Sequence, residues 1–133
     1  MRKLLLLSVF LLNGCALVDA YLMTKYDPNE YSLITTIRAD AGQFKNSCTD
    51  AVASKDNANK IVYETILFKN YSENIPKNDN GYKSAIALNE IAQGLADRYN
   101  KPDPVSPIFC KLKFGGIESS AGLMQHVIGN KPR

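Results

Sequence analysis

The sequence predicts an all-α protein, a small bundle of four to five short helices with one disulfide bond between Cys48 and Cys110. Apolar residues recur at spacings of three and four in several segments, which is the period of an amphipathic helix. Two segments begin with a capping residue followed by proline, as helices often do. The 133 residues are enough for only one compact domain.

The first helix is expected to begin at Asp27-Pro28-Asn29-Glu30. Asp27 can accept hydrogen bonds from the free amides, Pro28 suits the first turn, and Glu30 completes a capping-box pattern. One apolar stripe follows, at Ile34, Ile37, Ala41, Phe44 and Cys48. Cys48 is therefore expected to point toward the core.

A second helix is expected over residues 57–72, after a polar stretch at 54–57. Its broad apolar stripe contains Ile61, Val62, Thr65, Ile66, Phe68 and Tyr71. A strand is the alternative, because Ile-Val-Tyr and Ile-Leu-Phe favour sheets. The segment lacks strict alternation and is flanked by Lys, Asn and Glu, so the pattern favours a helix.

A turn over residues 73–81 leads to a third helix, expected over 82–100. Its apolar face carries Leu88, Ile91, Ala92, Leu95 and Tyr99. Gly94 lies within this helix at a cost of about 1 kcal/mol relative to alanine. We interpret it as a point of close helix packing.

Ser106 and Pro107 predict the start of a fourth helix, which carries Ile108, Cys110 and Leu112. The pair Gly115-Gly116 is expected to interrupt this helix. A last piece over residues 117–128 carries Leu123, Val127 and Ile128.

The start of the chain has the pattern of a secretory signal peptide. Arg2 and Lys3 give it positive charge, and the apolar stretch Leu4 to Leu12 follows, broken only by Ser8. That stretch is too short to span a bilayer, which takes about 20 apolar residues. The alternative is a buried N-terminal helix.

The segment Leu12-Asn13-Gly14-Cys15 resembles the lipobox (type II) signal peptide of bacterial and phage lipoproteins. The resemblance implies that residues 1–14 are removed and that Cys15 is lipidated, so the partner of Cys15 is the lipid bilayer. Asn13 departs from the small or aliphatic residue usual there. Ala16 stands where an Asp would signal inner-membrane retention, which implies the outer membrane, with the protein facing the periplasm.

Residues 15–26 would then be the lipidated N-terminus and tether, and residues 27–133 a single helical domain, for which the sequence indicates no family. The alternative is cleavage by an ordinary signal peptidase after Ala20, with Val18 and Ala20 as the small residues. That cleavage would leave a secreted or periplasmic protein without a lipid.

Export would place Cys48 and Cys110 in an oxidising compartment, where such a pair usually forms a disulfide. A bond closing about 60 residues contributes about 4 kcal/mol in the chain-entropy model. The alternative is two free buried thiols. A zinc site is not supported, because two distant cysteines and one histidine do not make a four-ligand set.

The charge of the mature chain argues against nucleic acid as a partner. The full chain has 16 basic and 13 acidic residues, and removal of Arg2 and Lys3 leaves 14 basic residues. A nearly neutral chain lacks the basic surface that neutralises phosphates.

No motif for catalysis, a metal or a cofactor is found. His126 is the one histidine and cannot be placed in a triad, and Gly115-Gly116 is not a phosphate loop. Paired carboxylates could cleave sugars, and the candidates are Glu30, Asp40, Glu64, Glu73, Glu90 and Glu118. Of these, Glu90 and Glu118 are the least obvious surface charges, yet each fits an exposed helix face. We predict that the protein is not an enzyme.

The sequence therefore predicts a membrane-anchored, periplasm-facing lipoprotein that binds an unidentified protein. In size it resembles two classes of phage lipoprotein, the outer-membrane spanins of lysis and the proteins that block a surface receptor during superinfection exclusion. A host-encoded periplasmic lipoprotein is equally admissible. A periplasmic inhibitor or a carrier of an apolar ligand is one alternative, because a bundle with seven Tyr could hold a ligand between helices. A small cell-wall hydrolase is the other.

Overall fold

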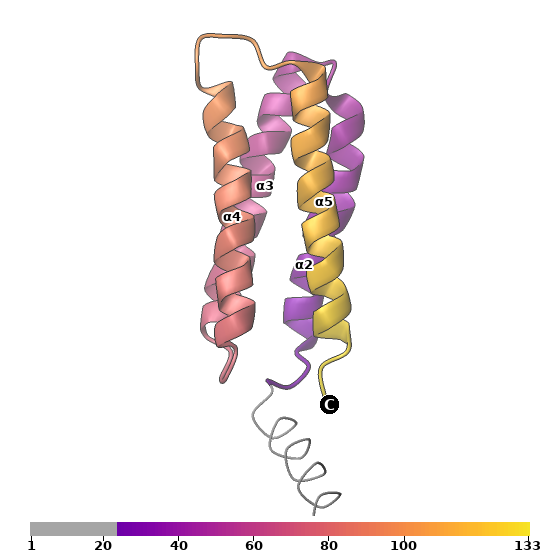
Figure 1. The fold of residues 1–133 in the computed structure, drawn as a ribbon, viewed down its shortest axis with the longest axis vertical. Coiled ribbons are helices and arrows are strands. Elements are labelled where there is room, and N and C mark those ends of the chain that lie inside the picture. The colour runs from indigo at the N-terminus through magenta and orange to yellow at the C-terminus, as the bar shows by residue number, and fades with distance from the viewer. Residues whose placement is uncertain (1–23) are drawn as a thin grey trace, which may run out of the picture.

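A computed structural model describes residues 24–133 as four α-helices arranged as a bundle (Figure 1). They are α2 (Pro28–Phe44), α3 (Ala51–Glu73), α4 (Asp79–Tyr99) and α5 (Pro107–Gly129), with the short 3₁₀ helix η1 (Lys45–Ser47) after α2. Consecutive helices run antiparallel. The predicted all-α bundle is confirmed. The predicted signal peptide, the predicted lipidation site Cys15 and the alternative cleavage site Ala20 lie outside the described residues.

The four helices form two closely packed pairs. α2 packs mainly against α5, and α3 packs mainly against α4, while α4 and α5 have the least contact of the neighbouring helices. Both ends of the described chain, Thr24 and Arg133, lie at the same end of the bundle (Figure 1). We refer to it as the anchor end, because the lipid anchor predicted from the sequence at Cys15 would precede Thr24 there. Residues 24–26, expected in the tether, lie against the bundle here, since the Tyr26 amide donates to the Pro132 carbonyl oxygen.

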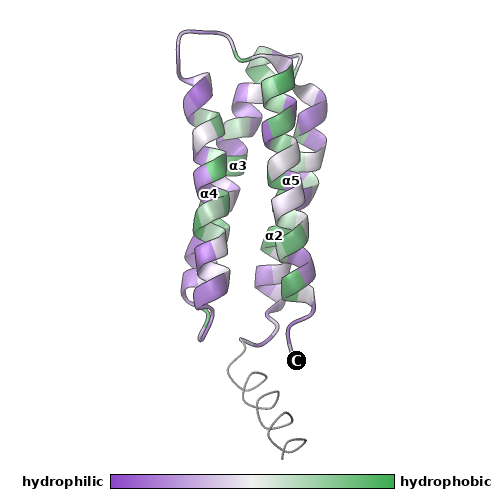
Figure 2. Cartoon of the chain, in the orientation of Figure 1, coloured by the Kyte–Doolittle hydropathy of each residue, from purple (hydrophilic) through white to green (hydrophobic). Residues whose placement is uncertain are grey.

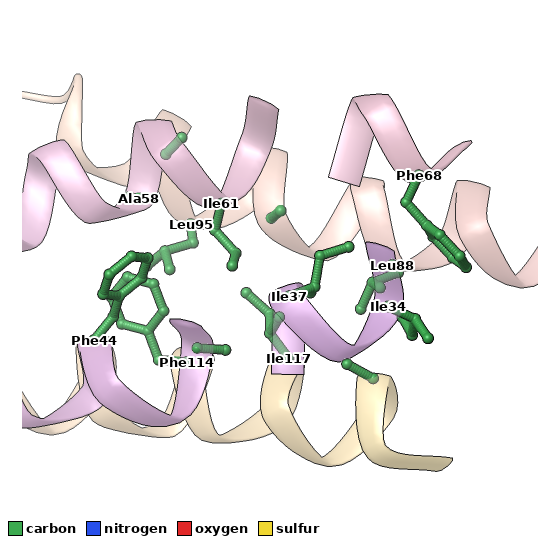
Figure 3. Close-up of a cluster of buried hydrophobic side chains, with 14 of the residues drawn as sticks. Ile34, Ile37, Phe44, Ala58, Ile61, Phe68, Leu88, Leu95, Phe114 and Ile117 are labelled. Carbon is green, nitrogen blue, oxygen red and sulfur yellow. The ribbon is translucent and has the colours of Figure 1, made fainter. Parts of the chain in front are cut away.

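The core is filled by side chains from all four helices (Figure 3). The stripe predicted on α2 is confirmed, because Ile34, Ile37, Ala41, Phe44 and Cys48 are all buried. The rings of Phe44 and Phe114 meet edge to face with centroids 5.7 Å apart. On α3 and α4 the stripes are only partly buried, since Ile61, Thr65, Phe68, Leu88, Ala92 and Leu95 face the core but Ile91 is exposed.

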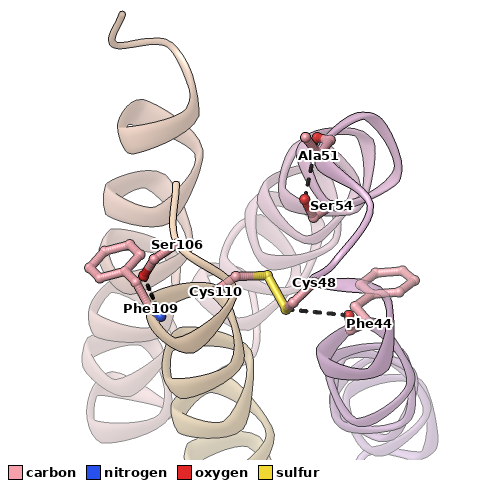
Figure 4. The surroundings of a disulfide bond; sticks show 7 residues. All are labelled: Phe44, Cys48, Ala51, Ser54, Ser106, Phe109 and Cys110. Atoms are coloured by element: carbon pink, nitrogen blue, oxygen red, sulfur yellow. Dashed lines mark hydrogen bonds between the residues drawn. A yellow bond between two sulfur atoms is a disulfide. The ribbon is translucent and has the colours of Figure 1, made fainter. Parts of the chain in front are cut away.

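The predicted disulfide joins Cys48, just after η1, to Cys110 in the first turn of α5 (Figure 4). The two residues are 62 apart in sequence, their Cα atoms are 5.7 Å apart, and both side chains are buried. Ser106 caps α5 beside it, because its hydroxyl oxygen accepts a hydrogen bond from the Phe109 amide. The bond closes the bundle at the end opposite to the anchor end.

Three helix boundaries differ from the sequence prediction. α3 begins at Ala51 rather than 57, because the Asp50 carboxylate caps it by accepting from the Ala53 amide. The polar stretch at 54–57 is therefore helical. α4 begins at Asp79 rather than 82. The fourth and fifth predicted pieces are one helix, α5, because Phe114 and Ile117 on either side of the glycine pair are fully buried, and their packing outweighs about 1 kcal/mol per glycine.

The interpretation of Gly94 as a packing point is wrong. Gly94 is exposed, and a Cβ placed on it would meet no atom within 4 Å. Close approach of two helices occurs instead at Gly42, where a Cβ would lie 2.8 Å from Glu118 Oε1. The sequence does not distinguish the two glycines, because both lie within helices and only the neighbouring helix differs.

Candidate functional site

The outer face of α5 carries a row of uncovered apolar side chains. Ile108, Leu112, Leu123 and Val127 are 74%, 70%, 67% and 56% exposed, and the exposed small residues Gly116 and Ser119 lie between them. Figure 2 shows α5 hydrophobic toward both ends and pale in the middle. The spacings of three and four place all six on one face of the helix. We call these six residues the α5 stripe.

The α5 stripe is distinct from the buried face of the same helix. The buried face consists of Cys110, Phe114, Ile117, Ala121 and Ile128. Of the six residues that the sequence analysis singled out as carried by the two predicted pieces of α5, only Cys110 and Ile128 are buried. Exposed apolar residues scattered singly are ordinary, but four of them along one helix face are typical of a binding surface.

A groove of about 850 Å³ adjoins the α5 stripe at the anchor end, between the start of α4 and the end of α5. Its apolar lining comes from Phe68, Leu123, Met124, Val127 and Ile128. Lys77, Lys83 and Asp79 supply charge on the side of α4. Leu123 and Val127 belong to both the groove and the α5 stripe, so the two features form one continuous surface.

A buried ion pair lies next to this groove. The Glu30 carboxylate is fully buried and receives the Lys131 ammonium at 2.7 Å, the Asn78 side-chain amide at 2.9 Å and the Ser72 hydroxyl at 3.4 Å. Lys131 also donates to Asn78 Oδ1 at 3.1 Å. The capping-box role expected for Glu30 is wrong: its carboxylate joins α2 to the α3–α4 turn and to the segment after α5.

The α3–α4 turn is shaped to bring Asn78 to this ion pair. Lys77 adopts φ 60°, a left-handed conformation that costs a residue with a Cβ about 1 kcal/mol. A Cβ on Gly81 would overlap Asn78 Oδ1. The turn therefore requires a residue without a side chain at position 81. The same turn forms part of the groove wall.

A second charged cluster lies between α2 and α3, away from the groove. Lys60 Nζ is 2.7 Å from Asp40 Oδ2 and 3.6 Å from Glu64 Oε1, and it lies 5.3 Å from the centre of the Phe44 ring. Burial, with a hydrogen bond to Asp40 and the charge of Asp40, raises the pKa of Glu64 to about 7. Burial by itself would raise the pKa of Asp40, but the hydrogen bonds of Asp40 to Lys60 and Glu64 lower that pKa below its usual value. Glu64 Oε2 is buried without a hydrogen-bond partner.

Among the carboxylates proposed from sequence, only Asp40 and Glu64 meet. Glu118 pairs instead with Lys45, at 2.5 Å, and Glu73 and Glu90 are exposed. Glu90 therefore lies on an exposed helix face, as the sequence indicated. His126 is also exposed, near the end of α5. Neither Asp40 nor Glu64 lines the groove, so the pair does not share a surface with it.

Two further observations bear on chemistry and location. Within residues 24–133, no three His, Cys, Asp or Glu side chains are grouped so that they could hold a metal ion. No helix in the same range combines the length and apolarity needed to cross a bilayer.

Sequence reasoning missed the α5 stripe as a surface and the partners of Glu30. The sequence contains a pattern that could have revealed the stripe, because α5 has apolar residues on more than one face. A helix that packs against its own protein on one side has only one apolar face. No comparable signal marks Lys131, which lies in a basic tail 101 residues from its partner.

Comparisons with protein-family models, with curated proteins and with solved structures give no match to this chain. The features that bear on function are therefore the α5 stripe, the groove and the predicted signal peptide.

Proposed function

We propose that this chain is a membrane-anchored, periplasm-facing lipoprotein that acts as a non-enzymatic binding protein. The observation that carries the proposal is the α5 stripe with its adjoining groove, an uncovered apolar surface beside a core that is already filled. Apolar surface of this extent is stabilised when a partner removes it from water.

The anchor follows from the lipobox resemblance at Cys15. Thr24, the first described residue, donates a hydrogen bond to the Pro76 carbonyl oxygen at the rim of the α3–α4 turn. The nine residues from Cys15 to position 23 can extend over about 30 Å at most. A lipidated Cys15 therefore keeps the anchor end, and with it the groove, within about 30 Å of the bilayer surface.

The protein partner is proposed to be a component of the cell envelope. If the chain is phage-encoded, the compact bundle favours superinfection exclusion over lysis. A lysis subunit is expected to carry a long coiled-coil seam, whereas the longest helices described have 23 residues and are about 35 Å long. Blocking a receptor needs only a binding surface near the membrane.

Two experiments test the anchor and the binding surface separately. Labelling with radioactive palmitate should mark the full chain but not the Cys15→Ser variant, and continued labelling of that variant would contradict the lipobox assignment. A photo-crosslinking amino acid at position 123 should give an adduct with another protein in intact cells, while the same group at position 52, an exposed apolar site on α3, should not. Equal adducts at both positions, or none at 123, would contradict a binding role for α5.

The groove favours one further candidate function, carriage of an apolar ligand with an acidic head. Its lining is apolar around Phe68 and Met124, and Lys77 and Lys83 lie on its rim. A fluorescent long-chain fatty acid should bind the full chain and be displaced by unlabelled fatty acid. Met124→Trp, which fills the groove, should weaken that binding, whereas Tyr63→Trp on α3 should not. Undiminished binding by the Met124 variant would exclude the groove as the carrier site.

A hydrolase has less support than either binding role. Asp40 and Glu64 are close together, but Lys60 pairs with both of them and they lie away from the groove where a substrate could be held. His126 is exposed and lies on α5, whereas these two carboxyl groups are on α2 and α3.

A further inference from the structure

The α5 stripe has the same order of residue sizes when α5 is followed in either direction. Its six positions form three pairs placed symmetrically about the midpoint between Ile117 and Glu118. The outer pair is Ile108 with Val127, the next is Leu112 with Leu123, and the inner pair is Gly116 with Ser119. Large exposed apolar residues are thus matched with large ones, and small residues with small ones.

This symmetry is what a two-fold interface between identical helices requires. In such an interface, residue i of one copy meets residue j of the other, and residue j meets residue i. When two α5 helices pack antiparallel about an axis at the midpoint, Leu112 meets Leu123 of the second copy and Ile108 meets its Val127. The small residues at 116 and 119 then lie where the helices cross, and small residues there let two helices approach closely.

We propose that two copies of this chain associate through their α5 stripes, antiparallel about a two-fold axis, when no envelope partner occupies the stripe. A Cβ placed on Gly116 would meet no atom of its own chain within 4 Å, so this part of α5 is open to an approaching helix. The groove supports the same arrangement. Its wall contains Leu123 and Val127, which would receive Leu112 and Ile108 of the second copy.

The start of α4 lies across the groove from the α5 stripe. α4 presents Ser84, Ala87, Ile91 and Gly94 as exposed, mostly small residues at spacings of three and four. Because Ser84 lines the same groove as Leu123 and Val127, a helix seated on the α5 stripe would also approach the start of α4.

The size of the contact predicts a weak association for the free chain. A helix of 23 residues is about 35 Å long, and one helix pair of that length falls at the small end of specific interfaces, below about 1,200 Å². If the proposed lipid anchor is correct, confinement to one membrane raises the effective concentration and strengthens the pair. The antiparallel arrangement puts the two anchor ends about 35 Å apart, and both could reach one bilayer through their tethers when the bundles lie along it.

Cysteine crosslinking tests both the contact and its direction. Full-length Leu112→Cys and Leu123→Cys variants are purified in mild detergent, mixed and oxidised, and the linked peptides are identified by mass spectrometry. The antiparallel pair predicts 112–123 links between copies at least about 10-fold above 112–112 and 123–123 links, because positions 112 and 123 are about 16 Å apart along the helix. An excess of 112–112 links, or no links, would overturn the proposal.

Sedimentation equilibrium of the full chain gives the strength of the association. Leu112→Glu should weaken self-association about 100-fold, because each substitution acts twice across the two-fold axis. Val52→Glu is the matched control, since Val52 is 73% exposed but lies on α3, and it should associate like the parent. The double variant Leu112→Lys, Leu123→Glu should restore association, because each lysine then faces a glutamate of the other copy.

Two results would contradict the dimer. One is a parent chain that stays monomeric at about 100 μM, where complexes with micromolar dissociation constants are largely formed. The other is equal association of the Leu112→Glu and Val52→Glu variants. Because 112 and 52 are both exposed, circular dichroism should show that each variant remains folded. Neither result depends on lipidation of Cys15, so failure of the dimer and failure of the anchor are separable.

Discussion

Replacing Lys131 with methionine should lower the free energy of unfolding by about 3–5 kcal/mol, although Lys131 lies beyond the last helix. Its ammonium group is 2.7 Å from Glu30 Oε2, and the Glu30 side chain is 0% exposed. Methionine keeps much of the apolar stem of lysine and removes the charge. Glu30 is then a buried carboxylate whose other donors, Asn78 and Ser72, are neutral. Leaving a buried charge without its partner accounts for the magnitude.

The assay is urea denaturation followed by circular dichroism, with the disulfide intact. The midpoint should fall while the slope of free energy against urea stays constant. Lys45→Met is the matched control. Lys45 also contacts a carboxylate, Glu118 at 2.5 Å, but both side chains are about one-third exposed, so the loss should be under about 1 kcal/mol.

The double variant Glu30→Met, Lys131→Met tests the physical reason for the loss. If an uncompensated charge is responsible, removing both charges should recover most of the stability lost in Lys131→Met. A loss in Lys131→Met no larger than that in Lys45→Met would refute the reasoning. So would a double variant that is less stable than the single one, because the loss would then come from packing rather than charge.

Three further predictions concern pH, the disulfide and glycine. Folding raises the pKa of Glu64 from 4.5 to about 7, so between these pH values the folded chain holds a proton that the unfolded chain releases. The stability that this group contributes therefore falls as the pH rises through that range. Between pH 5 and 8, urea titrations should show that the parent loses about 2 kcal/mol more stability than Glu64→Gln. Replacing both Cys48 and Cys110 with serine should cost about 4 kcal/mol in the same assay, because the bond closes a loop of 62 residues, and a loss under about 1 kcal/mol would contradict the chain-entropy estimate. Gly94→Ala should raise the thermal midpoint, with a gain of about 1 kcal/mol in stability, because the new Cβ meets no other atom. Gly81→Ala should lower the thermal midpoint, because the new Cβ overlaps the Asn78 side chain. An equal effect of the two substitutions would contradict this difference.

The sequence predicted local features well where one residue acts on its own segment. Asp27 caps α2 by accepting hydrogen bonds from the amides of Asn29 and Glu30, and Ser106 caps α5, both as expected. Such caps depend on atoms two or three residues away, so a short pattern contains all the information. The prediction failed at Gly115-Gly116, because whether a helix continues past glycine depends on how well Phe114 and Ile117 pack against other helices.

In the candidate site, too, nearby residues can be predicted from the sequence, whereas contacts between helices cannot. The sequence marks Leu112 and Leu123 as apolar, but only the packing of α5 against α2 leaves them uncovered. Similarly, the pattern around Glu30 fits a capping box, and only the folded chain brings Asn78 and Lys131 to its carboxylate.

By itself, the sequence determined that this protein is helical, where α2 and α5 begin, and that Cys48 and Cys110 can form a bond. Each of these follows from local spacing or from residue type. Only the tertiary structure decided which apolar residues are covered and which charges are paired. Those properties depend on side chains from helices far apart in sequence, and a helical period shows which residues share a face but not what lies against that face.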